Sequence, residues 1–176
     1  VATMVHAANI DEFDGLKEIL GRYPLKSWSV DVPCLTGNMA GNRPLAADPE
    51  QAAARMGYSF GGGYYGSSGG YACGAHLAAV MADGSICKCG HYGDRPAGRI
   101  GEGLAAVWRR MRPTLLDELS CRCSQLESCR GGCRYRAELF PCVYSSDPIQ
   151  CFARGVPVGG DLMYARARRK KGGELP

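Results

Sequence analysis

The sequence lacks long hydrophobic runs and is poor in histidine. No stretch of about eighteen or more apolar residues appears in its 176 residues, and the first ten, VATMVHAANI, have neither the basic nor the apolar region of a signal peptide. We therefore expect no membrane span and no export, and we predict a cytoplasmic protein. The chain opens on Val1 instead of Met, which favours a fragment of something longer.

Nucleotide- and nucleic-acid-binding signatures are also missing. The glycine-rich stretch Gly61 to Gly70 is followed by no Gly-Lys-Ser/Thr, and no GxGxxG opens a helix after a strand. The net charge of +4 comes partly from the basic run Arg166 to Lys171, which no aromatic-interleaved patch accompanies. We interpret that run as a solvated end and do not expect nucleic-acid binding.

Cysteine, in contrast, is abundant. The chain has ten cysteines and three histidines, and 45% of its residues are apolar, which is ordinary for a globular protein. Thiols at this density indicate disulfides, a metal site or catalysis, and the redox compartment decides among them. Without an export signal, metal binding is the leading interpretation.

The first third of the chain has an α/β pattern. VATMV is a short apolar strand, residues 11–20 have helical spacing with Asp11 as the expected N-cap, and SWSVDVP is a second strand. A strand, a helix and a strand at this spacing predict a parallel βαβ unit. Since two strands cannot form such a sheet alone, this is a second reason to suspect missing upstream strands.

The middle of the chain predicts irregular structure around one short helix. EQAAARM is the expected helix, and Gly61 to Gly70 is too rich in glycine to pack as a regular element. This glycine-rich loop is either a linker or a segment that shapes a substrate entrance, with Tyr64 and Tyr65 able to rest on a peptide. Both interpretations remain open.

A small α+β module follows. Two short apolar runs flank Asp83-Gly84, a strong signal for a β-hairpin with thiols on its second arm. Residues 99–111 then predict an amphipathic helix covering that hairpin, and its expected apolar face comprises Ile100, Leu104, Val107, Trp108 and Met111.

The spacing of the thiols favours an iron-sulfur cluster. Such a cluster takes four thiolates from wrapping loops, and adjacent glycines such as Gly131 and Gly132 let backbone amides face its sulfides. Structural zinc prefers paired CxxC knuckles, whereas this chain has CxC, CxxxxxC and CxxxC, so zinc and disulfides are the weaker alternatives. The suitable thiols are Cys73, Cys89, Cys121, Cys123, Cys129, Cys133 and Cys151.

These cysteines resemble those of the SPASM domain, the C-terminal extension of radical S-adenosylmethionine (SAM) enzymes. Ten residues separate Cys73 from Gly84 and four separate Gly84 from Cys89, which fits the family's intervals. The later intervals through Cys123, Cys129 and Cys133 fit as well. Where the family has a leading cysteine this chain has Ser120, and Cys121 offers a thiol one residue later.

The resemblance spans residues 73–151 and implies two auxiliary [4Fe-4S] clusters. Cys73, Cys89 and Cys133 would bind the first, with either Cys87 as a fourth ligand or a site open to substrate. The implied ligands of the second cluster are Cys121, Cys123, Cys129 and Cys151. The CxxxCxxC motif of the SAM-cleaving cluster is absent, so SAM and a third [4Fe-4S] cluster are expected only in the complete enzyme.

The implied fold class is α/β followed by α+β. Residues 1–48 resemble the closing βαβ strands of a partial TIM-like barrel, and 49–72 are a connecting segment rich in glycine. Residues 73–151 form the cysteine-rich SPASM domain of hairpin and helix, and 152–176 form a basic tail.

The implied function is electron transfer or substrate binding during peptide or protein modification, with a redox partner such as ferredoxin or flavodoxin. The alternatives are a non-catalytic iron-sulfur module that transfers electrons or binds a peptide, and an enzyme of cofactor or haem biosynthesis. The catalytic residue is unknown, and Asp31 is a weak candidate. His76 and His91 flank the first cluster region, and Cys34 and Cys142 are interpreted as free thiols.

Overall fold

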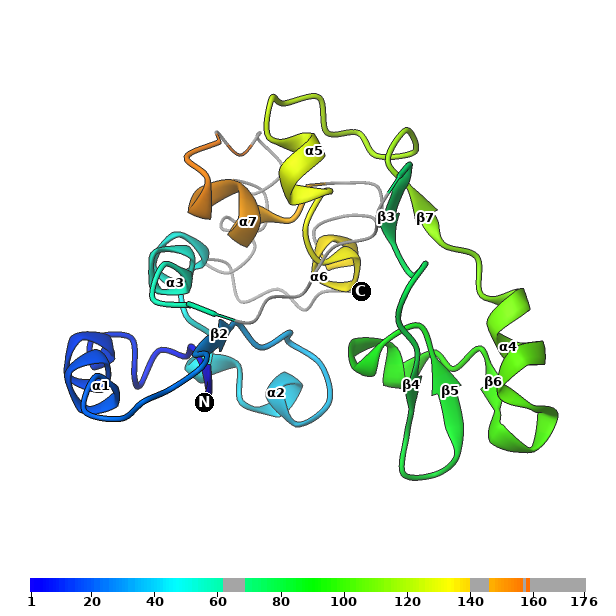
Figure 1. The fold of residues 1–176 in the computed structure, drawn as a ribbon, viewed down its shortest axis with the longest axis horizontal. Helices are drawn as coiled ribbons and strands as arrows, with labels where there is room; N and C mark the ends of the chain where they lie inside the picture. The colour runs from blue at the N-terminus through cyan, green and yellow to red at the C-terminus, as the bar shows by residue number, and fades with distance from the viewer. Residues whose placement is uncertain (62–68, 140–145, 157, 159–176) are drawn as a thin grey trace. The chain divides into compact units, whose positions relative to one another are not determined.

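The computed structural model describes residues 1–61, 69–139, 146–156 and 158, and Figure 1 shows their elements. They fall into two compact units. Residues 1–61 and 148–156 belong to the first unit, and residues 69–139, 146–147 and 158 belong to the second. The glycine-rich loop is described only at Gly61, Gly69 and Gly70, and Tyr64, Tyr65, Cys142 and the basic run lie outside the described residues.

The first unit contains the predicted parallel βαβ unit. Strands β1 (Ala2–Met4) and β2 (Ser29–Asp31) pair in parallel, and helix α1 (Phe13–Leu20) connects them. The prediction of Asp11 as the N-cap is wrong. Glu12 occupies the N-cap and its side chain makes no capping hydrogen bond, because the chain turns once more before the helix begins.

The core of the first unit is aromatic and aliphatic. Phe13 stacks on Trp28 at a centroid distance of 6.1 Å, and Tyr58 meets both rings. The indole N–H of Trp28 donates to the hydroxyl of Thr3 at 2.9 Å, so this buried ring keeps its hydrogen bond. Val5, Val30 and several alanines and isoleucines complete this core.

Further helices enclose that core. Helix α2 (Asn38–Gly41) and the 3-10 turn η1 (Arg43–Leu45) precede α3 (Pro49–Met56), which confirms the helix predicted over EQAAARM. Asp48 caps α3 by accepting the N–H of Glu50 at 3.0 Å. Helix α7 (Pro148–Ala153), far away in the sequence, packs against α3 and adds Ile149 to the core.

The second unit contains the predicted hairpin. Strands β4 (Ala79–Val80) and β5 (Ser85–Cys87) pair antiparallel around Asp83 and Gly84, whose φ of 80° explains the glycine. A third strand, β6 (Gly98–Arg99), joins β5 after the 3-10 segment η2 (Gly90–Asp94). Figure 1 shows this three-stranded sheet in green.

The predicted helix over 99–111 is shorter than expected. The 3-10 turn η3 (Ile100–Glu102) ends at Gly103, whose φ of 85° breaks the helical path, and α4 (Leu104–Arg110) follows. Of the five residues of the expected apolar face, only Val107 is buried, and it lies against Gly98 of β6. The prediction of one continuous apolar face is therefore wrong.

A second small sheet lies beside the cysteine-rich segment. Strand β3 (Tyr71–Cys73) pairs antiparallel with β7 (Thr114–Leu115), and the short helices α5 (Leu126–Cys129) and α6 (Arg134–Glu138) follow. The described residues thus form a mixed α/β structure with small sheets and no closed barrel. No helix within the described ranges is both long and apolar enough to cross a membrane.

Candidate metal centre

Three of the predicted ligands, Cys73, Cys89 and Cys133, form a first group of thiols in the second unit. Cys73 ends β3, Cys89 precedes η2 and Cys133 is the N-cap of α6. Burial raises the pKa of the Cys73 thiol, and the nearby Cys89 and Cys133 raise it further. Segments far apart in the sequence therefore bring these three thiols within electrostatic reach of one another.

Cys89 in this group lies at a turn whose surroundings act on the pKa of its thiol in opposite directions. Burial raises the pKa of its thiol, whereas the backbone N–H groups of His91 and Tyr92 lower it. The charge of Lys88 also lowers the pKa of both Cys89 and Cys73. Amide donors and a cation beside a sulfur stabilise the deprotonated form, which is the form that binds metal.

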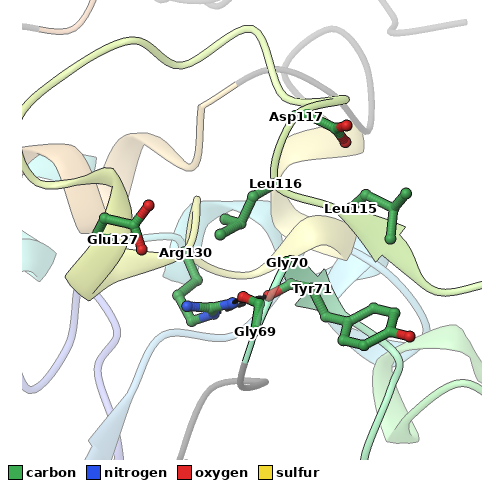
Figure 2. Close-up of a pocket in the computed structure, with 8 residues that line it drawn as sticks. All are labelled: Gly69, Gly70, Tyr71, Leu115, Leu116, Asp117, Glu127 and Arg130. Carbon is green, nitrogen blue, oxygen red and sulfur yellow. Dashed lines mark hydrogen bonds between the residues drawn. The ribbon is translucent and has the colours of Figure 1, made fainter.

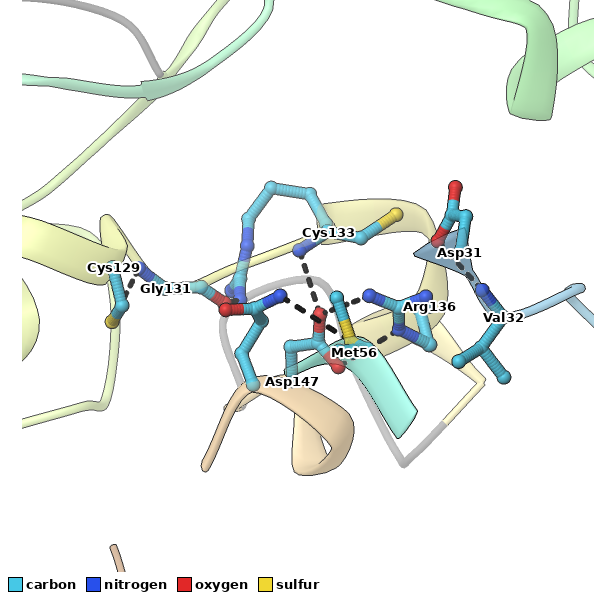
Figure 3. Close-up of polar contacts among 10 residues, drawn as sticks. Asp31, Val32, Met56, Cys129, Gly131, Cys133, Arg136 and Asp147 are labelled. Atoms are coloured by element: carbon cyan, nitrogen blue, oxygen red, sulfur yellow. Dashed lines mark hydrogen bonds and ion pairs between the residues drawn. The ribbon is translucent and has the colours of Figure 1, made fainter. Parts of the chain in front are cut away.

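Cys121, Cys123 and Cys129 form a second group. Burial raises the pKa of Cys121, and the nearby Cys129 and Cys123 raise it as well. The Cys129 sulfur accepts the N–H of Gly131 at 3.3 Å, as Figure 3 shows. Gly131 and Gly132 have left-handed φ values of 76° and 72°, and the Gly132 N–H donates to the carbonyl of Cys129 at 2.9 Å, so both amides turn back toward Cys129.

The remaining predicted ligands lie elsewhere. Cys87 is fully buried in β5, and the charges that raise its pKa after burial are those of Asp83 and Asp94, not of thiols. Cys151 lies on α7 in the first unit, as does the buried Cys34 in the loop after β2. None of the nine described cysteines forms a disulfide.

The grouping of thiols falls short of a formed metal site. Among the described residues, no group of three or more His, Cys, Asp or Glu side chains has the geometry to hold a metal ion. The thiols within each group therefore lie within electrostatic reach, but among the described residues they do not have the geometry of metal coordination.

A buried arginine, Arg134, acts electrostatically on one thiol of each group. It was not among the residues predicted from the sequence. Arg134 is 0% exposed, and its guanidinium donates to the carbonyl of Gly131. Its charge lowers the pKa of both Cys73 and Cys121, one thiol from each group. Arginine repeated among the cysteines, at positions 130, 134 and 136, was the available signal.

A buried ion pair fixes the backbone at Cys133. The Asp147 carboxylate accepts the Cys133 N–H at 2.8 Å and two hydrogen bonds from Arg136, at 2.9 and 2.8 Å (Figure 3). The Asp147 side chain is 0% exposed and that of Arg136 is 7% exposed. The carboxylate thus holds the backbone at the residue that precedes α6.

Aromatic residues line the side of the first thiol group. Tyr92 donates to Glu138 at 2.6 Å, and Tyr135 donates to Asp94 at 3.1 Å and stacks with His91. The pKa of Tyr92 is raised far above its usual value, first by burial and then by the hydrogen bond to Glu138. Cys73 and Cys133 add to this shift, which places the Tyr92 ring near the first group.

The other candidates from the sequence have simpler environments. Asp31 is half-buried at the end of β2 and accepts the N–H of Val32 at 2.7 Å. His76 is exposed in the loop after β3. Nothing in these surroundings distinguishes Asp31 as a catalytic base.

An open pocket of about 760 Å³ lies next to the cysteines. Figure 2 shows its lining, which comes from the start of β3, the end of β7 and α5. The eight lining residues are Gly69, Gly70, Tyr71, Leu115, Leu116, Asp117, Glu127 and Arg130. Gly69 and Gly70 are the end of the glycine-rich loop for which the sequence left two interpretations open, a linker or a segment that shapes a substrate entrance.

Comparison with known proteins gives no relative. The chain matches no family model, no curated protein and no solved structure. The chemistry available is therefore that of the residues themselves, namely two groups of thiols, cations that favour thiolates, and an adjoining pocket.

Proposed function

We propose that this chain is the auxiliary-cluster region of a radical SAM enzyme with a SPASM domain, and that it holds two [4Fe-4S] clusters. One observation carries the proposal. The thiols that the resemblance assigns to the first cluster, Cys73, Cys89 and Cys133, lie within electrostatic reach of one another although the sequence separates them widely. The three thiols of the second unit that the resemblance assigns to the other cluster, Cys121, Cys123 and Cys129, are close in the sequence, and Cys123 and Cys129 lie within electrostatic reach of Cys121.

The residues present suit an iron-sulfur group in their chemistry. All the proposed ligands are thiols, and the Gly131 N–H donates to the Cys129 sulfur at 3.3 Å. Bound clusters would supply one-electron transfer or an open iron site for substrate. This chain's own residues would hold the thiolates in partly buried positions and balance part of their negative charge with Arg134 and Lys88.

The first test is the metal itself. Anaerobic reconstitution should load about eight irons and a similar amount of sulfide per chain, as two four-iron clusters. Iron and sulfide analysis with electron paramagnetic resonance (EPR) of the reduced protein measures this loading. Zinc in place of iron, or iron for only one cluster, would contradict the proposal.

The second test concerns the complete enzyme. A CxxxCxxC motif upstream in the same gene, and reductive cleavage of SAM by the full-length product, would support peptide or protein modification as the function. A product with two clusters but no cleavage would point instead to a non-catalytic iron-sulfur module.

A further inference from the structure

The pocket beside the thiols combines apolar and acidic surfaces. Leu115 and Leu116 are half-buried in its lining, whereas Asp117 and Glu127 are exposed (Figure 2). Within the described part of the chain, neither carboxylate makes a hydrogen bond or an ion pair. In contrast, the neighbouring Glu118 pairs with Arg112 and accepts the Leu115 N–H.

The one cationic side chain of the lining, that of Arg130, is hydrogen-bonded to backbone carbonyls. Arg130 donates from Nε and Nη2 to the carbonyl of Tyr71 at 2.8 and 2.6 Å, and it also donates to the carbonyl of Gly69. These carbonyls lie on the edge of β3 that is not paired with β7, since the Gly70 carbonyl accepts from Leu116 of the β7 side. Arg130 thus covers a strand edge, and the two carboxylates remain available to a ligand.

We propose that this pocket binds a lysine or arginine side chain of the peptide substrate. The aliphatic stem of such a side chain would lie on Leu115 and Leu116, and its charged end would meet Asp117 and Glu127. The inference rests on the proposed function, because it takes the ligand to be a substrate peptide.

The position of the pocket gives such binding a purpose. Tyr71 lies two residues before Cys73 of the first thiol group, and Glu127 and Arg130 flank Cys129 of the second. A basic residue held here would bring the adjoining peptide next to both groups of thiols. The pocket is therefore a specificity site and not the place of chemistry.

The experiment measures peptide binding by the full chain. The probe is a fluorescein-labelled, C-terminally amidated hexapeptide with one lysine between two leucines, and its control carries glutamine in place of lysine. We expect the lysine peptide to bind at least fivefold more tightly at low ionic strength, and salt to reduce this difference. Asp117→Asn and Glu127→Gln should each weaken lysine-peptide binding about threefold, and the double variant about tenfold. Glu12→Gln, an exposed carboxylate of the first unit, is the matched control.

Several outcomes would overturn the inference. These are no detectable binding of the lysine peptide, equal binding of the two peptides, and full lysine-peptide affinity in the double variant. Binding that requires removal of residues 159–176 would identify the chain's own basic run as the occupant, which also overturns it. Iron content is measured on the same samples, because failure of the metal with intact peptide preference refutes the proposed function alone.

Discussion

At the scale of single residues, position 121 tests the resemblance most directly. The thiol of Cys121 lies near Cys123 and Cys129, whereas Ser120 occupies the place of the family's leading cysteine. Because thiolate is the stronger ligand for iron, we expect Cys121→Ala to remove the second cluster's EPR signal and about four irons. Ser120→Ala is the matched control and should keep both clusters. Loss of the cluster in Ser120→Ala alone would assign ligation to the serine.

Asp147 is a second residue whose replacement should have a large effect. Its carboxylate is fully buried and compensates the charge of Arg136, so Asp147→Asn leaves a buried cation with a neutral partner. We expect the free energy of unfolding to fall by about 3 kcal/mol, measured by urea denaturation. Glu102→Gln, which breaks the exposed pair with Arg110, should stay close to the original protein. Equal effects of the two changes would mean that the buried pair does not stabilise the unit.

At the scale of elements, a side-chain hydrogen bond joins α1 to the residues after α3. Tyr58 donates to Asp14 at 2.5 Å, and this bond is the largest cause that raises the pKa of Tyr58 above its ordinary value of 10.0. A raised pKa in the folded state means that the contribution to stability is complete below pH 10 and is lost as pH rises through the folded-state pKa.

Asp14→Asn should therefore lower the pKa of Tyr58 toward its ordinary value. Carbon-13 NMR of labelled tyrosine rings measures this pKa, and the stability difference between the two proteins should shrink above pH 10. Glu18→Gln changes the same helix at an exposed pair with Arg22 and should leave the Tyr58 titration unchanged. An identical titration in Asp14→Asn would show that the hydrogen bond does not control Tyr58.

The elements predicted correctly are those with local signals. The βαβ unit follows from the apolar spacing of its strands and helix, the helix after Asp48 has its cap next to it, and the hairpin depends on the turn residues Asp83-Gly84. Strands β3 and β7 were not predicted, since each has two or three residues and finds its partner about forty positions away. The predicted helix over 99–111 was too long because the positive φ of Gly103 interrupts an otherwise helical pattern.

The candidate site, like the fold, was predictable only where the sequence carries a local signal. The resemblance implied two sets of thiols, and six of these thiols fall into two groups whose members lie within electrostatic reach of a common cysteine. The pocket was not predictable, because Arg130 reaches the edge of β3 only from a left-handed backbone, with φ of 50°. Charged side chains are usually expected at the surface. In the structure, however, three of them are buried, namely Arg134, Arg136 and Asp147.

At the scale of the whole molecule, the two units differ in what holds them together. The first has a continuous apolar core that includes Phe13, Trp28 and Val30. In the second, Arg134, Arg136 and Asp147 are buried together with Cys87 and apolar side chains such as Ile86 and Leu119, and the other described cysteines of the unit are half-buried. A unit with so little apolar core needs another source of stability, and bound metal would provide it.

Removal of the iron should therefore unfold the second unit selectively. In Trp108→Phe the buried Trp28 is the sole tryptophan, so its fluorescence reports the first unit, while hydrogen exchange of β5 amides reports the second. After anaerobic chelation we expect the β5 amides to lose protection and the Trp28 transition in urea to remain cooperative, with its midpoint little changed. This follows because the core around Trp28 is formed from apolar contacts that need no thiol. Persistent hydrogen-exchange protection of the β5 amides in the iron-free protein would show that the second unit folds on its own core. Metal binding by the thiols would then not be needed to stabilise that unit.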